Sequence, residues 1–234
     1  MDTDLGLILK DIARLRGRRW VLSHIDLQIP PGEVWAIAGA NGAGKTTLLR
    51  VIASLLPPSR GTVRFDDRDP EQDLEAYRAK IAFLSHRMGM YEELSALENL
   101  DSVARLLGAP RSEAELSTLC EQVGIQGAAD IPVRKYSAGM RKRLALARLT
   151  LQKPRVVLLD EPYGQLDDAG FDLVDRMIRQ WKDEGCAVVL ASHLLERAGQ
   201  VADRGAILAS GQIRWVGAAA DLSNAWARLQ AEVA

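Results

Sequence analysis

Short apolar runs dominate the first part of the chain and are spaced as strands. Between residues 5 and 38, apolar positions alternate with polar ones or form brief continuous runs, and Pro30-Pro31-Gly32 is typical of a turn. Continuous runs of four or five apolar residues are typical of buried strands. We predict strands at residues 7–9, 25–29, 34–38, 62–65 and 81–84, the fourth of them at a sheet edge.

The middle of the chain has a different period. Between about residues 92 and 130, leucines and alanines recur at helical spacing with acidic residues between them, which predicts several inserted helices. Beyond the insertion, strand-like and helix-like stretches alternate at residues 155–159, about 169–184 and 187–191, before an alanine-rich, helix-like tail from about 218. This alternation predicts an α/β fold with a parallel sheet flanked by helices.

Composition narrows the class of protein. The chain has 234 residues, enough for one large α/β domain or two small ones, and 47% of them are hydrophobic. The 30 Lys and Arg residues nearly balance the 31 Asp and Glu residues, which argues against a nucleic-acid binder that relies on a basic face. Cys120 and Cys186 form no CxxC pair and fit a reduced cytoplasmic protein better than a disulfide scaffold.

The sequence predicts no membrane-spanning segment. Its longest apolar stretches, Val156–Leu159 and Ala187–Ala191, have the length of buried strands and fall far short of the ~18 residues that a spanning helix needs. The first residues, Met1–Asp4, lack the basic start of a secretory signal. We therefore expect any link to a membrane to run through a partner protein.

One glycine-rich stretch has the form of a phosphate-binding loop. It lies between an apolar run and a helix-like run and reads Gly39-Ala40-Asn41-Gly42-Ala43-Gly44-Lys45-Thr46. Glycines after a strand let main-chain N–H groups surround one anion, and the next helix adds the positive end of its dipole. Lys45 can reach the β- and γ-phosphates, and the Thr46 hydroxyl can bind Mg²⁺. The stretch predicts nucleoside triphosphate binding by Gly39, Asn41, Gly42, Ala43, Gly44, Lys45, Thr46 and Thr47.

Two carboxylates follow a buried strand further along the chain. Asp160 and Glu161 end the run that begins at Arg155, and parallel sheets bind ligands at the carboxyl ends of their strands. We expect Asp160 to hold Mg²⁺ through its waters. We expect Glu161 to accept a proton from a water that attacks the γ-phosphate. The alternative is a solvated strand end without a catalytic role.

Two further features could reach the same kind of ligand. Ser192-His193 follows the strand at 187–191, and His193 could hydrogen-bond the γ-phosphate and orient the attacking water, although a lone histidine is more often packed or solvent-facing. Ser137 is a good N-cap for a helix at about 141–151, and Gly139 leaves main-chain N–H groups open to an anion. The residues alone do not identify that anion, and a simple helix cap is an equal alternative.

In their order along the chain, these motifs resemble the nucleotide-binding domains of ABC transporters. A Ser-Ala-Gly signature lies at 137–139, Leu-Leu-Asp-Glu-Pro at 158–162, Gly-Gln-Leu-Asp at 164–167 and a switch histidine at 193. The resemblance covers nearly the whole chain. It implies a P-loop NTPase (RecA-like) α/β core with a parallel sheet, an N-terminal antiparallel β subdomain and an inserted α-helical subdomain. The implied parts of this single domain are a core at about 1–87 and 153–217, a helical signature subdomain at about 88–152 and a tail at about 218–234.

The same resemblance implies roles for individual residues. Members of this family pair head to tail around two ATP molecules, so Ser137 and Gly139 would contact the ATP of the partner copy. Glu161 would be the catalytic base, Asp160 would support Mg²⁺ and Asp167 would help to couple the two sites. The implied reaction is hydrolysis of ATP to ADP and phosphate. The implied partners are integral membrane subunits at the cytoplasmic face of the plasma membrane, and no nucleic acid.

Three residues depart from the family pattern, His86, Arg16 and Tyr163. His86 stands where a glutamine usually links Mg²⁺ to the membrane partner; it is a nucleotide-site candidate, but Mg²⁺ prefers oxygen and a positioning role is the alternative. Arg16 stands at the place of the adenine-stacking aromatic, and its guanidinium plane can also stack on a base. Trp20 is the other candidate for adenine, although its place before an apolar pair favours packing. Tyr163 stands where Thr or Phe is commoner.

Within the family, Arg16, Leu-Ser-His at 84–86 and Ser-Ala-Gly at 137–139 make the chain similar to the haem-exporter ATPases of cytochrome c maturation. The segment at 90–100 is similar to that group and also to drug- and lipid-exporting ABC ATPases. An exporter of drugs, lipids or polysaccharide is therefore the alternative, because membrane subunits select the substrate. A soluble ABC protein that acts on ribosomes or DNA is disfavoured, since those usually carry two nucleotide domains or long coiled coils and this chain has no basic excess.

Overall fold

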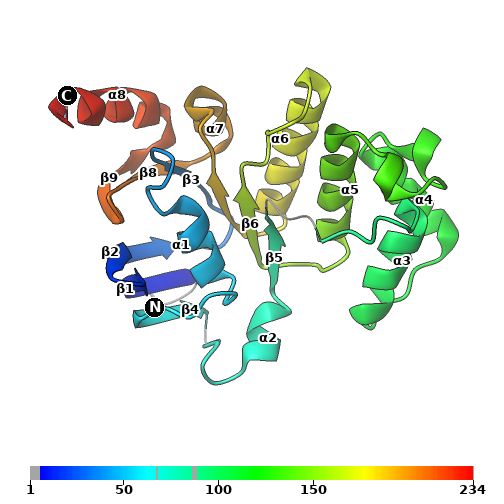
Figure 1. Cartoon of the computed structure of the whole chain (residues 1–234), viewed down its shortest axis with the longest axis horizontal. Helices are drawn as coiled ribbons and strands as arrows, with labels where there is room; N and C mark the ends of the chain where they lie inside the picture. The colour runs from blue at the N-terminus through cyan, green and yellow to red at the C-terminus, as the bar shows by residue number, and fades with distance from the viewer. Residues whose placement is uncertain (1–5, 67, 86–88, 234) are drawn as a thin grey trace.

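The fold is built on two β-sheets. The structure is a computed structural model that describes residues 6–66, 68–85 and 89–233. The strands of the larger sheet are β3 (Val34–Ala38), β5 (Ile81–Leu84), β6 (Val156–Asp160), β7 (Ala187–Ala191), β8 (Arg204–Ala209) and β9 (Gln212–Ala218). The smaller sheet consists of β1 (Leu7–Arg16), β2 (Arg19–Ile29) and β4 (Arg60–Phe65). The chain is thus an α/β fold with a second, all-antiparallel layer (Figure 1).

The larger sheet has the strand order β5-β6-β7-β3-β8-β9 and is parallel except for its last strand. Every residue of β3, β6 and β7 is buried, as expected for strands covered on both faces. The smaller sheet has the order β2-β1-β4, so β4 lies at an edge as predicted. The carboxyl ends of β3, β6 and β7 therefore lie side by side at one edge of the parallel sheet.

Helices cover both faces of the larger sheet. They are α1 (Lys45–Ile52), α2 (Leu74–Arg78), α3 (Ala96–Leu106), α4 (Glu113–Gln122), α5 (Ala138–Thr150), α6 (Asp168–Asp183), α7 (Leu195–Val201) and α8 (Leu222–Val233), with 3₁₀ turns at Gln126–Ala128, Val133–Lys135 and Ala219–Asp221. Capping boxes at Ser95 with Glu98 and at Ser112 with Glu115 fix where α3 and α4 begin. In the part of the chain that the structure describes, no helix is long and apolar enough to cross a membrane.

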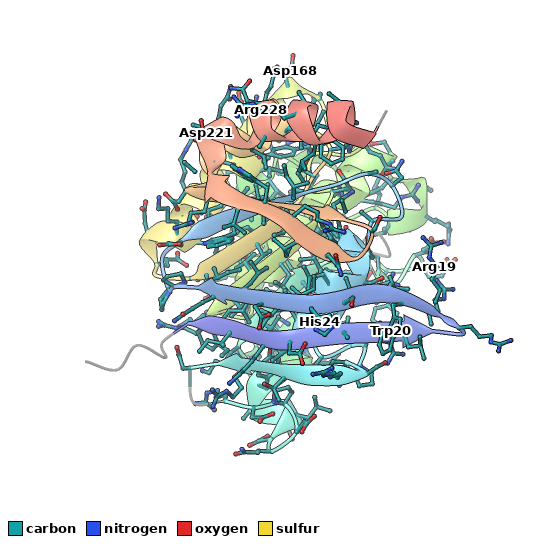
Figure 2. All side chains as sticks on the ribbon, turned by 90° about the vertical axis from the view of Figure 1, so that its left-hand side faces the viewer. Arg19, Trp20, His24, Asp168, Asp221 and Arg228 are labelled. Atoms are coloured by element: carbon teal, nitrogen blue, oxygen red, sulfur yellow. The ribbon has the colours of Figure 1, made fainter. Side chains whose placement is uncertain are left out.

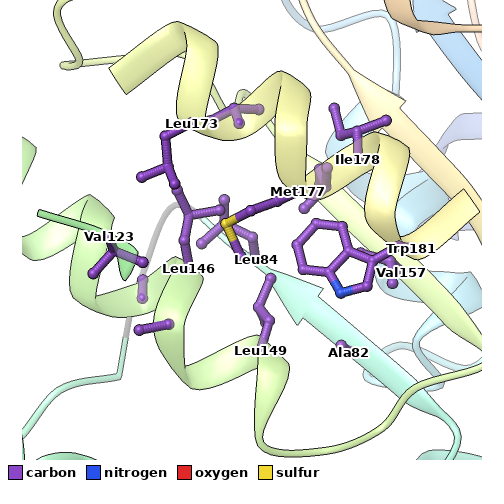
Figure 3. Packing of buried hydrophobic residues seen from close by; sticks show 14 of the residues in the cluster. Ala82, Leu84, Val123, Leu146, Leu149, Val157, Leu173, Met177, Ile178 and Trp181 are labelled. Atoms are coloured by element: carbon purple, nitrogen blue, oxygen red, sulfur yellow. The ribbon is translucent and has the colours of Figure 1, made fainter. Parts of the chain in front are cut away.

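Two apolar clusters hold these layers together. One lies between the two sheets around α1, with Leu48, Leu49 and Ile52 fully buried. The other joins the helices α3–α6 to the opposite face of the larger sheet, where Met177 and Trp181 of α6 pack toward Leu149 of α5 (Figure 3). The helix α1, which follows the glycine loop, is thereby packed between the two sheets.

Most predicted elements are confirmed, and the differences lie in the length of β1 and in two strands that were not predicted. The strands predicted at 34–38 and 81–84, the inserted helices, the helix near 169–184 and the helical tail are all present. The strand predicted at 7–9 runs on to Arg16, because a bulge at Asp11 with φ of 52° interrupts the alternation. The strands β8 and β9 were not predicted at all. The subdomain boundaries stay a prediction.

Candidate functional site

A cavity lies at the carboxyl ends of the central strands. It measures ≈ 660 Å³ and is lined by the glycine loop, the start of α1, the end of β6 and the tips of the β1–β2 and β8–β9 hairpins. The predicted residues that line it are Arg16, Asn41, Gly42, Gly44, Lys45, Thr46, Thr47, Asp160 and Glu161. Residues far apart in the sequence are therefore brought together around one space.

The glycine loop needs its glycines for steric reasons. Gly39, Gly42 and Gly44 have φ values of 154°, 81° and 113°, which L-residues with side chains rarely adopt. A Cβ at Gly39 would lie 2.3 Å from the carbonyl oxygen of Leu208, so no side chain fits there. Gly44 is the N-cap of α1 with no side-chain cap, and the first turn holds no acidic residue. The positive end of this helix is thus open toward an anion.

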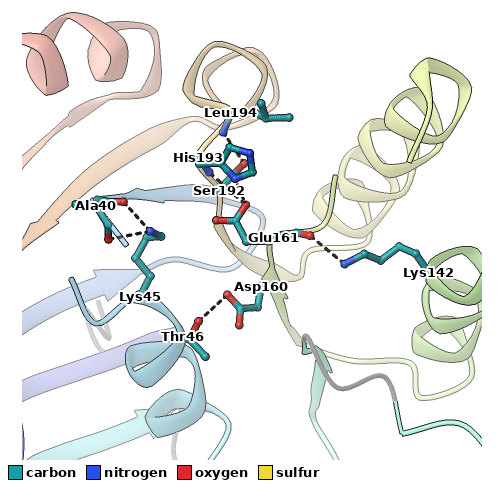
Figure 4. Close-up of polar contacts among 10 residues, drawn as sticks. Ala40, Lys45, Thr46, Lys142, Asp160, Glu161, Ser192, His193 and Leu194 are labelled. Atoms are coloured by element: carbon teal, nitrogen blue, oxygen red, sulfur yellow. Dashed lines mark hydrogen bonds and ion pairs between the residues drawn. The ribbon is translucent and has the colours of Figure 1, made fainter. Parts of the chain in front are cut away.

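Lys45 and Thr46 extend from this loop toward the space that phosphates would fill. Lys45 is only 8% exposed, and its Nζ donates to the carbonyl oxygens of Gly39 at 2.6 Å and Ala40 at 3.3 Å (Figure 4). The Thr46 hydroxyl donates to Oδ1 of Asp160 at 3.1 Å. Burial raises the pKa of the Asp160 carboxyl, while the Thr46 hydrogen bond opposes this shift. A hydroxyl and a carboxylate side by side are the oxygen donors that Mg²⁺ prefers.

Glu161 and His193 form a direct pair across two neighbouring strand ends. The Oε2 atom of Glu161 lies 2.7 Å from Nδ1 of His193 and 3.3 Å from its main-chain nitrogen. The Glu161 main-chain N–H donates to the carbonyl oxygen of Ala191 at the end of β7, which fixes the backbone after β6. Glu161 itself has φ of 49°. This left-handed backbone turns its carboxylate into the cavity that also contains Lys45 and Thr46.

The signature residues lie elsewhere. Ser137 is exposed, caps α5 by accepting a hydrogen bond from Met140 N–H at 3.2 Å, and, like Gly139, is not part of the cavity lining. Asp167 caps α6, accepts from Gly170 N–H at 2.9 Å and pairs with Arg143 at 2.8 Å. These contacts, first that of Gly170 and then that of Arg143, lower the pKa of Asp167. His86 lies outside the described residues.

Some residues of the site were missed or misjudged in the sequence. The expectation that Trp20 packs is wrong, since it is 52% exposed and lines the cavity beside Arg19, at one end of the β1–β2 hairpin (Figure 2). Arg19, Ser210 and Gly211 also line the cavity and were not predicted. Ser210 and Gly211 lie in the β8–β9 turn, which contacts β2 from a distant part of the chain, and Arg19 lies beside the turn of the β1–β2 hairpin, which was predicted only in part.

Lys142 of α5 was missed as well. It is 5% exposed, and its Nζ donates to the main-chain carbonyl of Glu161 at 3.0 Å. Burial lowers the pKa of this ammonium group, although the carboxylates of Asp160 and Glu161 act in the opposite direction. A signal was available, because Lys142 stands four residues before Leu146 and so on the apolar face of its helix.

The sequence is similar to those of several known proteins. Residues 22–164 match the model of a family described as ABC transporter. The cytochrome c biogenesis ATP-binding export protein CcmA of Bordetella bronchiseptica is 42% identical over 179 residues, which cover 76% of this chain and 80% of that protein. The lantibiotic transport ATP-binding protein SrtF of Streptococcus pyogenes is 31% identical over 198 residues, or 84% of each chain.

A solved structure agrees with the fold over nearly the whole chain. The dimeric structure of a bacterial ABC transporter cassette superposes with a TM-score of 0.80 at 25% sequence identity, covering 91% of this chain and 98% of that one. The mixed, mostly parallel sheet with an antiparallel layer beside it is the fold that the motif order implied.

Proposed function

The chain belongs to the ABC transporter family as an ATP-binding subunit, and we propose that it hydrolyses ATP to drive separate membrane subunits in the maturation of cytochrome c. The observation that carries the hydrolytic part is the Glu161–His193 pair, 2.7 Å apart, at a cavity that also holds Lys45 and the Thr46–Asp160 contact. A phosphate-binding loop alone would support binding; the adjoining carboxylate and imidazole support catalysis.

We assign phosphate binding to the glycine loop and Lys45. The open N-terminus of α1 offers main-chain N–H groups, and the Lys45 ammonium moves from the loop carbonyls of Gly39 and Ala40 onto the β- and γ-phosphates. Thr46 and Asp160 would hold Mg²⁺, which would neutralise charge on the β- and γ-phosphate oxygens. Asn41, Gly42, Ala43 and Thr47 complete the predicted phosphate-binding set.

Glu161 acts as the general base. Its carboxylate takes a proton from a water whose oxygen forms a bond to the γ-phosphorus as the bond between that phosphorus and the ADP oxygen breaks. The imidazole of His193 donates through Nδ1 to the Glu161 carboxylate, so its Nε2 can accept a hydrogen bond from the attacking water and orient it. The two side chains thus orient one another before the reaction begins.

Adenine would lie against the β1–β2 hairpin. Arg16 and Trp20 both line the cavity there, and each offers a flat surface for stacking. The exposed indole of Trp20 is available for a base, whereas an indole packed in the core would not be. We therefore assign Trp20 a larger share of the adenine contact than Arg16.

Two copies would complete two such sites. Ser137 and Gly139 sit at the exposed start of α5, away from the cavity of their own chain, which suits a contact with the ATP of a second copy. The similarity to a cassette that was solved as a dimer supports this arrangement. Asp167, held between α5 and α6, would couple the two sites.

The transport role is proposed from the relatives. CcmA of Bordetella bronchiseptica, named as a cytochrome c biogenesis export protein, supports haem export or the release of a haem-loaded chaperone through integral membrane subunits. The chain would then work at the cytoplasmic face of the plasma membrane. SrtF, named for lantibiotic transport, favours a second candidate, an exporter of another cargo with the same ATP chemistry.

Affinity purification of this chain from its native membrane, followed by mass spectrometry, tests the transport role. Co-purification of multi-span haem-handling proteins is expected. Recovery of a single drug- or lipid-export permease instead would overturn the cytochrome c role and leave the ATPase assignment standing. Steady-state release of phosphate from Mg²⁺·ATP by the recovered complex tests the ATPase separately.

A further inference from the structure

The segment that follows β6 is hydrogen-bonded to α5 at both of its ends. This segment, residues 161–167, carries Glu161 at its start and Asp167 at its end. Two consecutive residues of α5 hold it: Lys142 Nζ donates to the Glu161 carbonyl at 3.0 Å, and Arg143 contacts Asp167 Oδ1 at 2.8 Å. Figure 4 shows the Lys142 side chain reaching from α5 to the main chain of Glu161.

The helix also touches the middle of this segment. A Cβ built on Gly139 would lie 3.0 Å from the carbonyl oxygen of Gln165, so the two backbones approach closely. Gln165 itself has φ of 71°, a second left-handed residue within seven positions of the chain. The first two turns of α5 and residues 161–167 therefore form one packed unit.

The buried position of Lys142 calls for a specific reason. An ammonium group that is 5% exposed has lost most of its water, and an apolar side chain of similar length would fill the same volume without that cost. Its hydrogen bond goes to a main-chain carbonyl, and that carbonyl belongs to the residue with the reactive carboxylate. The same carbonyl accepts the Gly164 N–H at 3.3 Å.

Glu161 needs such support because of its backbone. A left-handed φ of 49° is costly for a residue with a side chain and persists only where neighbours hold it. His193 holds the carboxylate from the β7 side, whereas Lys142 holds the carbonyl from the α5 side. Loss of either contact frees one end of the same residue.

We propose that Lys142 is a positioning residue for the catalytic base: it fixes the backbone of Glu161 from α5, the helix whose first turn engages the nucleotide of the partner copy. This inference rests on the proposed function. Lys142 takes part in no chemical step and acts only through the place of the Glu161 carboxylate. A shift of α5 on contact with the second nucleotide would then reach the base of its own chain through one hydrogen bond.

The test compares three variants of the full chain. Lys142→Met removes the donor and keeps the length of the side chain, and Lys142→Arg keeps a cationic donor. Lys182→Met is the matched control, because it removes the same ammonium from a lysine of α6 that pairs with Asp203 rather than with the site. Should Lys142→Met fail to bind ATP, Lys142→Gln replaces it under the same criteria.

Two measurements are made on each variant. Steady-state hydrolysis of Mg²⁺·ATP gives kcat and KM, and hydrogen–deuterium exchange reports on the amides of Gly164 and Leu166 in the 161–167 segment. In Lys142→Met we expect kcat to fall roughly 10- to 100-fold with KM within about twofold, since a base displaced by about 1 Å loses rate rather than binding. We expect exchange of the segment to quicken, Lys142→Arg to recover much of the rate, and Lys182→Met to match the parent.

Each remaining outcome overturns the inference or the function. If kcat is unchanged in Lys142→Met, Lys142 does not position the base, whether or not exchange of the segment quickens. Lower kcat with unchanged exchange means that Lys142 acts by another route and also rejects the proposal. If the parent chain and its recovered complex hydrolyse no ATP, the proposed function fails, and the exchange result alone then decides: quicker exchange in Lys142→Met supports the contact, and unchanged exchange rejects it.

Discussion

The Glu161 carboxylate is held by His193 at two points, with the ring Nδ1 2.7 Å and the main-chain nitrogen 3.3 Å from the same oxygen, Oε2. The second oxygen, Oε1, takes no part in this contact and belongs to a residue that lines the cavity. Because Glu161 follows β6 and His193 follows β7, the pairing of these two strands brings the residues together. Positioning of the base is thus a property of the sheet edge as well as of the side chains.

Replacing Glu161 with Gln is expected to separate ATP binding from turnover. The amide keeps the size of the side chain but cannot accept the proton, so hydrolysis should fall by roughly 10² or more. ATP should still bind, and a paired, ATP-loaded form should accumulate. Phosphate release and size-exclusion chromatography with Mg²⁺·ATP measure the two effects. Normal turnover in Glu161→Gln would refute the assignment of the base.

Trp20→Ala is expected to weaken ATP binding more than Arg16→Ala does. An aromatic ring stacked on a base contributes about 1–3 kcal/mol, so the dissociation constant should rise about 5- to 150-fold in Trp20→Ala. Equilibrium dialysis with labelled ATP provides the two values, and binding of tripolyphosphate serves as the control because it has no base. If Arg16→Ala has the larger effect, the guanidinium carries the adenine contact.

Behind the site, the hydrogen-bonded side chains of Tyr163, Asp175 and Arg197 are expected to stabilise the fold. The Tyr163 hydroxyl donates to Asp175 at 2.7 Å, and Arg197 pairs with the same carboxylate at 2.6 Å. Tyr163→Phe removes one donor from a carboxylate that is 5% exposed, so we expect a loss of about 1–2 kcal/mol in the free energy of unfolding. Asp172→Asn is the control, since Asp172 also pairs with Arg197 but is exposed, and its loss should stay below about 1 kcal/mol.

Urea unfolding of the two variants measures these differences. No loss in Tyr163→Phe would mean that the buried hydroxyl adds nothing to the pair between Asp175 and Arg197, and equal losses in the two variants would mean that burial does not strengthen the contact. Tyr163 is the residue that departs from the commoner Thr or Phe of the family, so the same experiment shows what this departure contributes to the fold.

Alkaline pH should destabilise the protein through its two thiols. Burial raises the pKa of Cys120 and of Cys186 from 9.0 to about 11. The thiols of the unfolded chain lose their protons first, so their stabilising contribution is complete below about pH 9 and is lost as the pH rises toward 11. We expect urea midpoints to fall between pH 9 and 11. The fall should be shallower in the Cys120→Ala/Cys186→Ala double variant, and parallel curves would contradict the assignment.

Local patterns in the sequence account for what could be predicted. The glycine loop, the strand before Asp160 and the capping serine at 137 each occupy a few consecutive residues whose chemistry is readable in place. Glycines are required in the loop because a Cβ at Gly39 would meet the Leu208 carbonyl oxygen and because Gly44 has φ of 113°. Of these positions, the glycine loop and Asp160 line the cavity, whereas Ser137 lies at the exposed start of α5.

Pairing over long distances accounts for what could not be predicted. Gly211 reaches the cavity because its carbonyl accepts a hydrogen bond from Ser23 N–H at 2.8 Å, a contact between β2 and the β8–β9 turn. The exposure of Trp20 depends on which face of β2 turns outward, and register shifts along β1 obscure that in the sequence. Lys142 becomes functional only when α5 packs beside the end of β6.

The distance of Ser137 from its own cavity bears on the kinetics of the enzyme. If each reaction centre contains Ser137 from one copy and Lys45 from another, the unpaired chains of a dilute solution contain only incomplete reaction centres. The rate would then rise with the square of the protein concentration until pairing saturates. A membrane subunit that binds two copies would replace this second-order step by a high local concentration. Mass action alone would then keep ATP consumption low wherever the transporter is not assembled.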